Sequence, residues 1–181
     1  LNRELVVFVG TMDYYPNVDG AIWFASEVMP ALRRIRPQLE FLIVGNHPSR
    51  VVRVLSRLPG VSVIGGVPDV RPYIVQADAV VAPLRMARGI QNKVLEALAC
   101  GRAVLASTPV CNTFGGNLPV GVVRCDGVAD FCSALAPERP ETARYSAAIR
   151  DQARVRFSWA SNLETLLSEL DHLPPAPGCS L

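Results

Sequence analysis

Short apolar runs alternate with amphipathic stretches along this chain, and that alternation restricts the folds it can adopt. The runs Leu5–Val9 and Ala79–Ala82 contain no polar residues, which is typical of strands covered on both faces. Between Ala21 and Ile35, apolar residues recur at helical spacing. Strands and helices that alternate with short connections form a parallel sheet. The sequence therefore predicts an α/β, doubly wound parallel sheet of about six strands with helices on both faces.

The expected elements follow from the same pattern. Strands are expected at Leu5–Val9, Phe41–Val44, Val61–Ile64, Ala79–Ala82, Ala103–Ala106 and Gly121–Arg124. Helices are expected from a cap at Asn17 or Asp19 to Pro37, then over 49–58, 70–76, 91–100, 128–136 and 141–156, with a last helix ending near His172. Pro16 is expected to keep residues 10–17 out of a helix, and 108–119 reads as a loop.

One domain boundary follows from this pattern. Residues 1–173 are expected to form one domain, and residues 174–181 a flexible tail. A strand begins almost at the first residue, so we expect the chain to be a piece of a longer protein whose N-terminal domain lies upstream.

Composition excludes several classes of protein. Half of the 181 residues are hydrophobic and only 19% are charged, which excludes a disordered chain. A formal net charge of +2 gives no argument for a nucleic-acid partner, and no apolar run is long enough to span a membrane. The five cysteines are odd in number and lack C-x-x-C spacing, which favours free thiols in a reducing cytoplasm over disulfides or a structural zinc site.

Common cofactor and nucleophile motifs are missing from the sequence. The first strand is followed by Gly10-Thr11-Met12-Asp13, which does not match the glycine pattern of dinucleotide sites. The chain also contains neither a P-loop nor a G-x-S-x-G nucleophile elbow. We therefore expect no cofactor and no metal site.

The segment Pro83–Gly101 carries the strongest functional signal. It joins a buried strand to a helix through a basic, glycine-containing loop, and in open α/β sheets ligands bind at such corners. The first N–H groups of the helix have no intrahelical partner and can hold a diphosphate, which Lys93 can also reach. Glu96 lies on the same face and can accept two ribose hydroxyls. Spacing alone favours an ordinary surface Lys93–Glu96 ion pair, which is the alternative interpretation.

Several segments together resemble the C-terminal, nucleotide-sugar-binding half of GT-B glycosyltransferases, close to the retaining family-4 group of glycosyl transferases group 1. The resemblance implies a Rossmann-like sheet. It is carried by Val9-Gly10-Thr11-Met12 with Pro16–Gly20, by Leu42–Gly45, by Arg88–Gly101 with Ala103–Ser107, and by Phe157-Ser158-Trp159.

The resemblance also implies roles for individual residues. Glu96 matches the glutamate that contacts the nucleotide ribose, whereas Arg88 stands where the family usually has an acid that contacts the sugar. Thr11 stands where the family often has an arginine, so Lys93 is our candidate for the main diphosphate contact, with Arg85 and Arg88 as further cations. Gly66 and Val67 lie where the family holds the nucleobase, although a simple strand-end turn also explains the glycines. The candidate nucleotide-sugar-binding residues are Gly10, Thr11, Gly66, Val67, Arg85, Arg88, Gly89, Ile90, Gln91, Asn92, Lys93 and Glu96, of which Lys93 and Glu96 are assigned to donor positioning in catalysis.

The leading prediction is the donor-binding domain of a glycosyltransferase. The resemblance implies a metal-independent, retaining hexosyl transfer from a uridine or guanosine diphosphate sugar to a polysaccharide, lipid or glycan-precursor acceptor. The missing N-terminal domain would supply the acceptor side and the general base, so we expect the chain alone to be inactive. The expected location is the cytoplasm or the cytoplasmic face of the inner membrane, where the whole protein could associate peripherally. A nucleotide-sugar epimerase and a non-catalytic nucleotide-binding or docking module remain alternatives.

Overall fold

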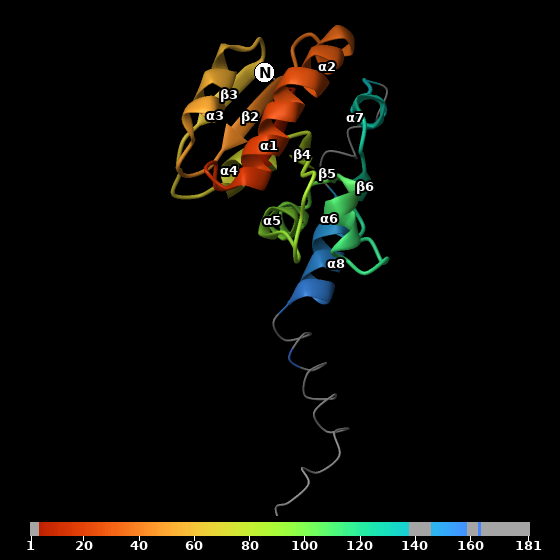
Figure 1. Ribbon diagram of the computed structural model, residues 1–181. Coiled ribbons are helices and arrows are strands. Elements are labelled where there is room, and N and C mark those ends of the chain that lie inside the picture. The colour runs from red at the N-terminus through yellow and green to blue at the C-terminus, as the bar shows by residue number, and fades with distance from the viewer. Residues whose placement is uncertain (1–3, 138–145, 159–162, 164–181) are drawn as a thin grey trace, which may run out of the picture.

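A parallel sheet forms the centre of the protein (Figure 1). The computed structural model describes residues 4–137, 146–158 and 163. Within these residues the sheet has six strands in the order β3-β2-β1-β4-β5-β6, which confirms the doubly wound, Rossmann-like prediction. The strands are β1 (Leu5–Val9), β2 (Glu40–Val44), β3 (Val61–Ile64), β4 (Ala79–Ala82), β5 (Val104–Ala106) and β6 (Val122–Arg124).

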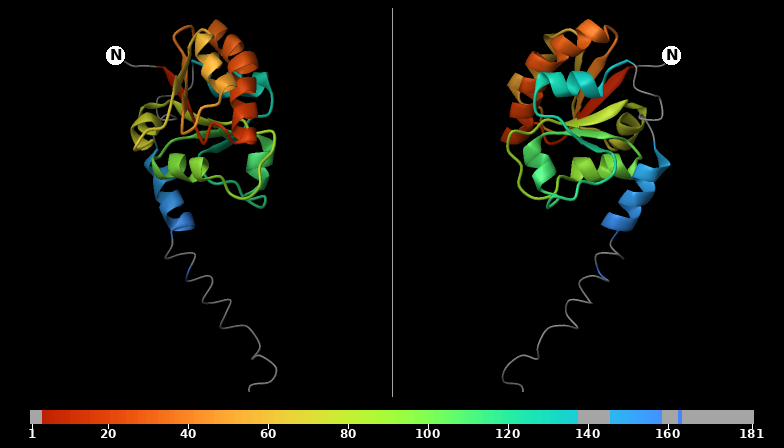
Figure 2. Two further views of the ribbon diagram at one scale, coloured as in Figure 1. Left: turned by 60° about the vertical axis from the view of Figure 1, so that its left-hand side comes forward. Right: turned by 90° about the vertical axis from the view of Figure 1, so that its right-hand side faces the viewer.

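Helices cover both faces of this sheet (Figure 2). The strand order runs outward in both directions from a central pair, β1 and β4. Because the crossovers are right-handed, the helices of the two halves then lie on opposite faces of the sheet. Among them, α7 packs against α2, and α8 packs against α5. The helical elements are α1 (Tyr15–Trp23), the π-helical turn η1 (Phe24–Val28), α2 (Met29–Ile35), α3 (Arg50–Val54), the 3₁₀ turn η2 (Leu55–Arg57), α4 (Arg71–Gln76), α5 (Asn92–Ala99), α6 (Thr108–Asn112), α7 (Val128–Ala134) and α8 (Ala147–Phe157).

The first helix begins earlier than predicted and contains an irregular turn. It starts at Tyr15, with Pro16 in its first turn, where a missing N–H group costs nothing. The prediction that Pro16 stays outside the helix is therefore wrong. Further along, the N–H group of Met29 donates to the carbonyl of Phe24, five residues back, which makes the turn π-helical. Pro30 follows directly, and a proline ring clashes with the carbonyl four residues before it in a regular α-helix.

A second correction concerns residues 108–119, which we expected to be a loop throughout. The structure places the short helix α6 at their start. The carboxylate of Asp126 accepts a 2.7 Å hydrogen bond from the backbone N–H of Thr108 and another of 2.7 Å from its hydroxyl. This cap comes from a residue distant in sequence, so local pattern could not reveal it.

The C-terminal predictions are only partly covered by the described residues. Helix α8 begins at Ala147, where the Ser146 hydroxyl accepts from the N–H of Ile149, and it ends at Phe157, one residue after the predicted end at 156. The predicted start of this helix at 141, the last helix to His172 and the tail over 174–181 lie outside the described residues. The division at residue 173 therefore stays a prediction.

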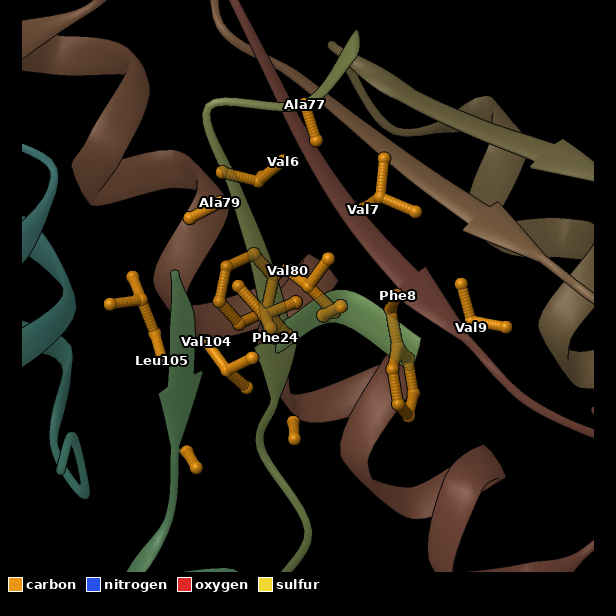
Figure 3. Packing of buried hydrophobic residues seen from close by; sticks show 14 of the residues in the cluster. Val6, Val7, Phe8, Val9, Phe24, Ala77, Ala79, Val80, Val104 and Leu105 are labelled. Carbon is orange, nitrogen blue, oxygen red and sulfur yellow. The ribbon is translucent and has the colours of Figure 1, made fainter. Parts of the chain in front are cut away.

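The core lies on both sides of β1 and β4 (Figure 3). Val6, Val7 and Phe8 are fully buried, which confirms that β1 is covered on both faces. On one side an aromatic group joins the first helical segment to α7, since the ring of Phe24 lies 4.6 Å from that of Phe41 and 5.2 Å from that of Phe131. Burial of such large rings stabilises the fold and fixes the helix against the sheet.

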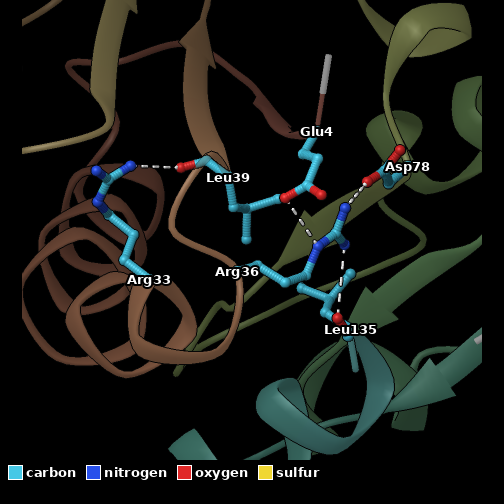
Figure 4. A network of polar contacts seen from close by, with 6 residues as sticks. All are labelled: Glu4, Arg33, Arg36, Leu39, Asp78 and Leu135. Atoms are coloured by element: carbon cyan, nitrogen blue, oxygen red, sulfur yellow. Dashed lines mark hydrogen bonds and ion pairs between the residues drawn. The ribbon is translucent and has the colours of Figure 1, made fainter. Parts of the chain in front are cut away.

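A buried charge network closes the amino edge of the sheet (Figure 4). The Arg36 guanidinium, 8% exposed, donates to Asp78 at 2.5 Å and to Glu4 at 3.2 Å. It also contacts the carbonyl oxygen of Leu135 at 3.5 Å. One side chain therefore joins the end of α2, the residues before β1 and β4, and the end of α7, at the edge away from the carboxyl ends of the strands.

The described residues bear on two features that the sequence argued against, disulfide bonds and a membrane-spanning helix. Cys100, Cys111, Cys125 and Cys132 form no disulfide, as predicted for these four, and Cys179 lies outside the described part. Within the same residues, no helix has the length and apolar character needed to cross a bilayer.

Candidate functional site

A pocket of about 410 Å³ opens at the carboxyl ends of β1 and β2, beside the start of α5. The strand order reverses between β1 and β4, and ligands of open α/β sheets bind at this kind of switch point. The pocket is lined by Val9, Gly10, Thr11, Asn17, Gly45, Asn46, Val70, Ile90, Gln91, Asn92, Lys93 and Glu96.

One wall of the pocket is main chain. The N–H group of Gly10 donates to Val44 at 3.0 Å, and that of Gly45 donates to the Gly65 carbonyl at 3.2 Å. A side chain on Gly45 would overlap the Gly10 carbonyl oxygen. Glycine is therefore required here, because the ends of β1 and β2 approach each other backbone to backbone.

Lys93 supplies a buried cation at the pocket. Its side chain is 7% exposed, and Nζ donates a 2.6 Å hydrogen bond to Oδ1 of Asn17. The sequence contains no other lysine. Among the described residues, no carboxylate lies within ion-pair distance of Nζ. Burial lowers the pKa of Lys93 to about 8, and the field of Glu96 only partly opposes this shift.

Glu96 lies one helical turn after Lys93 and is exposed to solvent. Partial burial raises its pKa above the usual value, while the charge of Lys93 acts in the opposite direction. Because Lys93 is buried and bonded to Asn17, the surface ion pair considered from spacing alone is not formed. A cation and a carboxylate thus line the same pocket without neutralising each other through direct contact.

Neither arginine of the loop before α5 lines the pocket. Arg85 forms a two-point ion pair with Asp19 on α1, with Nε 2.7 Å from the carboxylate. Arg88 is exposed, and its carbonyl accepts from the Gln91 side chain at 3.3 Å. The Gly89 carbonyl accepts from the same amide at 3.0 Å, and a φ of 65° at Gly89 favours glycine.

Gly66 and Val67 also lie outside the pocket lining. A side chain on Gly66 would collide with Oδ1 of Asn46, so this glycine gives Asn46 its place at the pocket. Val67 is partly buried against the core. Gly66 thus borders the pocket through Asn46, whereas Val67 packs against the core.

The structure brings together most, but not all, of the predicted residues. The predicted residues that line the pocket are Gly10, Thr11, Ile90, Gln91, Asn92, Lys93 and Glu96. The predicted residues outside the lining are Gly66, Val67, Arg85, Arg88 and Gly89. The lining residues that sequence reasoning missed are Val9, Asn17, Gly45, Asn46 and Val70. Gly45 and Asn46 directly follow a predicted strand, so the common edge of parallel strand ends was a usable signal. Asn17 was assigned to a helix cap, which hid its contact with Lys93.

The family model for "Glycosyl transferases group 1" matches residues 3–138. The chain belongs to this family. No match was found among curated proteins. Among the described residues, no group of three or more His, Cys, Asp or Glu side chains is arranged to hold a metal ion.

Solved structures of glycosyltransferases share the fold. HepE of Anabaena, crystallised with UDP and glucose, is 15% identical with a TM-score of 0.70, and the match covers 95% of this chain and 49% of HepE. A glycosyltransferase of Rickettsia africae is 13% identical with a TM-score of 0.71, covering 93% of this chain and 47% of its own. WaaG, a glycosyltransferase involved in lipopolysaccharide biosynthesis, is 18% identical with a TM-score of 0.63, covering 91% and 46%. The chain thus spans about half the length of these structural neighbours.

Proposed function

We propose that this domain binds the nucleoside-diphosphate sugar of a glycosyltransferase that passes the sugar to an acceptor. The observation that carries the proposal is Lys93, a buried cation without an ion-pair partner among the described residues, placed in a pocket at the strand ends. Such a cation costs free energy in an empty site and gains it when an anion arrives. Membership of the group 1 family makes the diphosphate of a sugar donor the natural anion.

The lining residues suggest how the donor lies. The diphosphate contacts Lys93 and the free N–H groups at the start of α5, where the helix dipole favours negative charge. Glu96 accepts the ribose hydroxyls. Asn46 and Val70 line the remaining part of the pocket and are available to the base. HepE was crystallised with UDP, so uridine and guanosine diphosphates are the ligands to compare first.

The chemistry of transfer is proposed as metal-independent and retaining, without a cofactor. Lys93 and helix N–H groups neutralise the diphosphate, and the retaining outcome rests on the family resemblance. The acceptor side and the general base come from an N-terminal domain, since the chain spans about half the length of its structural neighbours. Residues 1–181 alone should therefore bind nucleotide and transfer no sugar. Arg88, exposed on the loop before α5, is left to contact the sugar or the partner domain. The proposed setting is the cytoplasm, with peripheral membrane association of the whole protein.

The alternatives are less well supported by this geometry. An epimerase of similar architecture needs several carboxylates that converge on the sugar, and Glu96 is the only carboxylate that lines the pocket in the described residues. A docking module without nucleotide binding would not need a buried, unpaired lysine in a pocket. Its cost to stability would then bring no functional gain.

Calorimetric titration of the 181-residue chain with UDP and GDP tests the proposal. We expect one site for at least one nucleotide, unchanged by a chelator, and an affinity reduced about tenfold or more in Lys93→Met. Arg57→Met removes an exposed cation outside the pocket and should bind like the wild type. Absence of binding by the wild type would favour the docking module. Sugar transfer by the isolated chain would contradict the assignment of half the active site to another domain.

A further inference from the structure

The buried amide of Asn17 connects two parts of the pocket. Its side chain is 4% exposed. Nδ2 donates to the carbonyl oxygen of Thr11 at 2.9 Å, and Oδ1 accepts from Lys93 at 2.6 Å. Both ends of the amide are thus used, one on the loop after β1 and the other on α5.

Neighbouring groups fix the orientation of this amide. Since Nδ2 meets a carbonyl, which only accepts, Oδ1 must be the atom that faces the ammonium. Gly10 leaves the space that the amide occupies, because a side chain there would come within 2.7 Å of Nδ2. Asn17 therefore holds the Lys93 ammonium in one place through a rigid, neutral acceptor.

A neutral acceptor differs from a carboxylate in one decisive way. A carboxylate at this position would neutralise the ammonium and compete with any anionic ligand, whereas an amide orients the ammonium and leaves its charge uncompensated. We propose that Asn17 is a positioning residue that aims Lys93 at the pocket and keeps its positive charge available for a diphosphate. This inference rests on the proposed nucleotide site.

The described charged groups on the elements around the pocket do not form an ion pair with Lys93, which leaves this role to Asn17. Glu96, on α5 itself, acts on Lys93 only through its field. On α1, Asp19 is paired with Arg85. On the loop before α4, Asp69 is paired with Arg71. The strand that packs below the ammonium contributes the neutral ring of Phe8, and the loop after β2 contributes the exposed, uncharged Asn46 and the exposed His47.

The proposal predicts that a side chain at position 17 that binds Lys93 more strongly should lower the affinity of the pocket for UDP. Asn17→Asp preserves the shape of the side chain and adds a carboxylate beside Nζ. We expect the pKa of Lys93 to rise by about one unit or more, because an opposite charge favours the ammonium. At pH 7 the affinity for UDP should nevertheless fall about tenfold or more, because the charge is already compensated. Asn17→Leu should lower the pKa of Lys93 below its value of about 8.

The single lysine makes the direct measurement simple. In protein labelled with ¹³C-lysine, one Cε resonance reports the protonation of Lys93 without any ligand. UDP is then titrated between about pH 6.5 and about pH 9.5, a range that lies above the second phosphate ionisation near 6. These titrations give the alkaline limit of binding, which is the pH at which the affinity for UDP falls as Lys93 loses its proton. This limit should move to higher pH in Asn17→Asp and to lower pH in Asn17→Leu. Asn112→Asp adds the same charge at an exposed position outside the pocket and should change neither quantity.

The outcomes separate this inference from the proposed function. If the wild type binds neither UDP nor GDP, the proposed function fails before any variant is compared, and the inference fails with it. If the wild type binds but Asn17→Asp binds UDP equally well, the role of the neutral amide is wrong and the nucleotide site stands. An unchanged pKa of Lys93 in Asn17→Asp also overturns the inference. That variant is nearly isosteric, so the test does not depend on the folding of Asn17→Leu.

Discussion

The ammonium nitrogen of Lys93 lies 5.1 Å from the centre of the Phe8 ring, so a charge removed from water rests against an aromatic face on β1. Such a contact stabilises a desolvated cation by about 2 kcal/mol. Burial nevertheless lowers the pKa of Lys93 to about 8, because the charged form loses its hydration. The ligand-free domain therefore carries a cation that weakens its own fold.

Lys93→Met should stabilise the ligand-free domain while weakening nucleotide binding. The lowered pKa corresponds to a cost of about 3 kcal/mol for the charged lysine at pH 7. Lys93→Met also leaves Oδ1 of Asn17 without its hydrogen-bond donor, which offsets part of this gain. We therefore expect the free energy of unfolding to rise by about 1–2 kcal/mol. Urea unfolding at pH 7 measures the change. Arg57→Met, at an exposed site, should stay within about 0.5 kcal/mol of the wild type.

The same pKa predicts how stability depends on pH. Between the folded pKa of about 8 and the ordinary lysine pKa of 10.5, the unfolded chain binds more protons than the folded one at this site. The contribution of Lys93 to the free energy of unfolding therefore rises with pH through this window, and the advantage of Lys93→Met shrinks. Urea unfolding of both proteins at pH 7 and about 9.5 compares the two differences. A difference that grows with pH would contradict the buried, charged lysine.

Glu96→Gln should weaken the binding of UDP about tenfold without affecting inorganic pyrophosphate, because Glu96 is proposed to accept ribose hydroxyls. Since burial raises the pKa of this carboxyl, the wild-type preference for UDP over pyrophosphate should decline as acid protonates it, and Glu96→Gln should show no such decline. Competition titrations with the two ligands measure both effects. Equal losses for UDP and pyrophosphate would assign Glu96 to the diphosphate instead.

Arg36→Met should destabilise the domain by about 3 kcal/mol or more and leave nucleotide affinity unchanged. The variant removes the partner of the buried Asp78 carboxylate at the amino edge of the sheet, away from the pocket. Thermal or urea unfolding, combined with UDP titration of the folded protein, measures both results. Arg34→Met removes an exposed arginine of the same helix and should have little effect on either. A loss of UDP affinity in Arg36→Met would show that the two edges are coupled.

Gly66→Ala and Gly65→Ala form a matched pair. A side chain at Gly66 would collide with the Asn46 amide, whereas nothing lies within 4 Å of one at Gly65. Gly66→Ala should therefore weaken nucleotide binding severalfold by moving Asn46 out of the pocket wall, and Gly65→Ala should bind like the wild type. Titration with UDP and with pyrophosphate separates the base side from the phosphate side. Equal effects of the two substitutions would assign no special role to Asn46.

The parts of the site that sequence could predict are those close together along the chain. Lys93 and Glu96 lie one turn apart on a helix whose start is marked by a strand and a glycine loop, so local spacing places them on one face. The doubly wound parallel sheet, although not the order of its strands, followed from the alternation of strands and helices.

The rest depended on contacts between distant residues. Asn17 reaches Lys93 across 76 positions, and the carboxylate that caps α6 is 18 positions away from Thr108. Arg85 reads as a free cation in the sequence, but its partner Asp19 lies on another helix. Pro16 was misread because proline both ends helices and begins them, and the choice depends on the packing of the first turn.

The backbone wall formed around Gly10 and Gly45 has a consequence for divergence. A surface built from peptide groups keeps its shape while most side chains around the sheet change, provided that the glycines at the crossing remain. Differences in ligand preference between related proteins should then come from the few side chains that line the pocket, such as Asn46, Val70 and Gln91. New ligand preferences can arise there by single substitutions, and the framework that holds them need not be rebuilt.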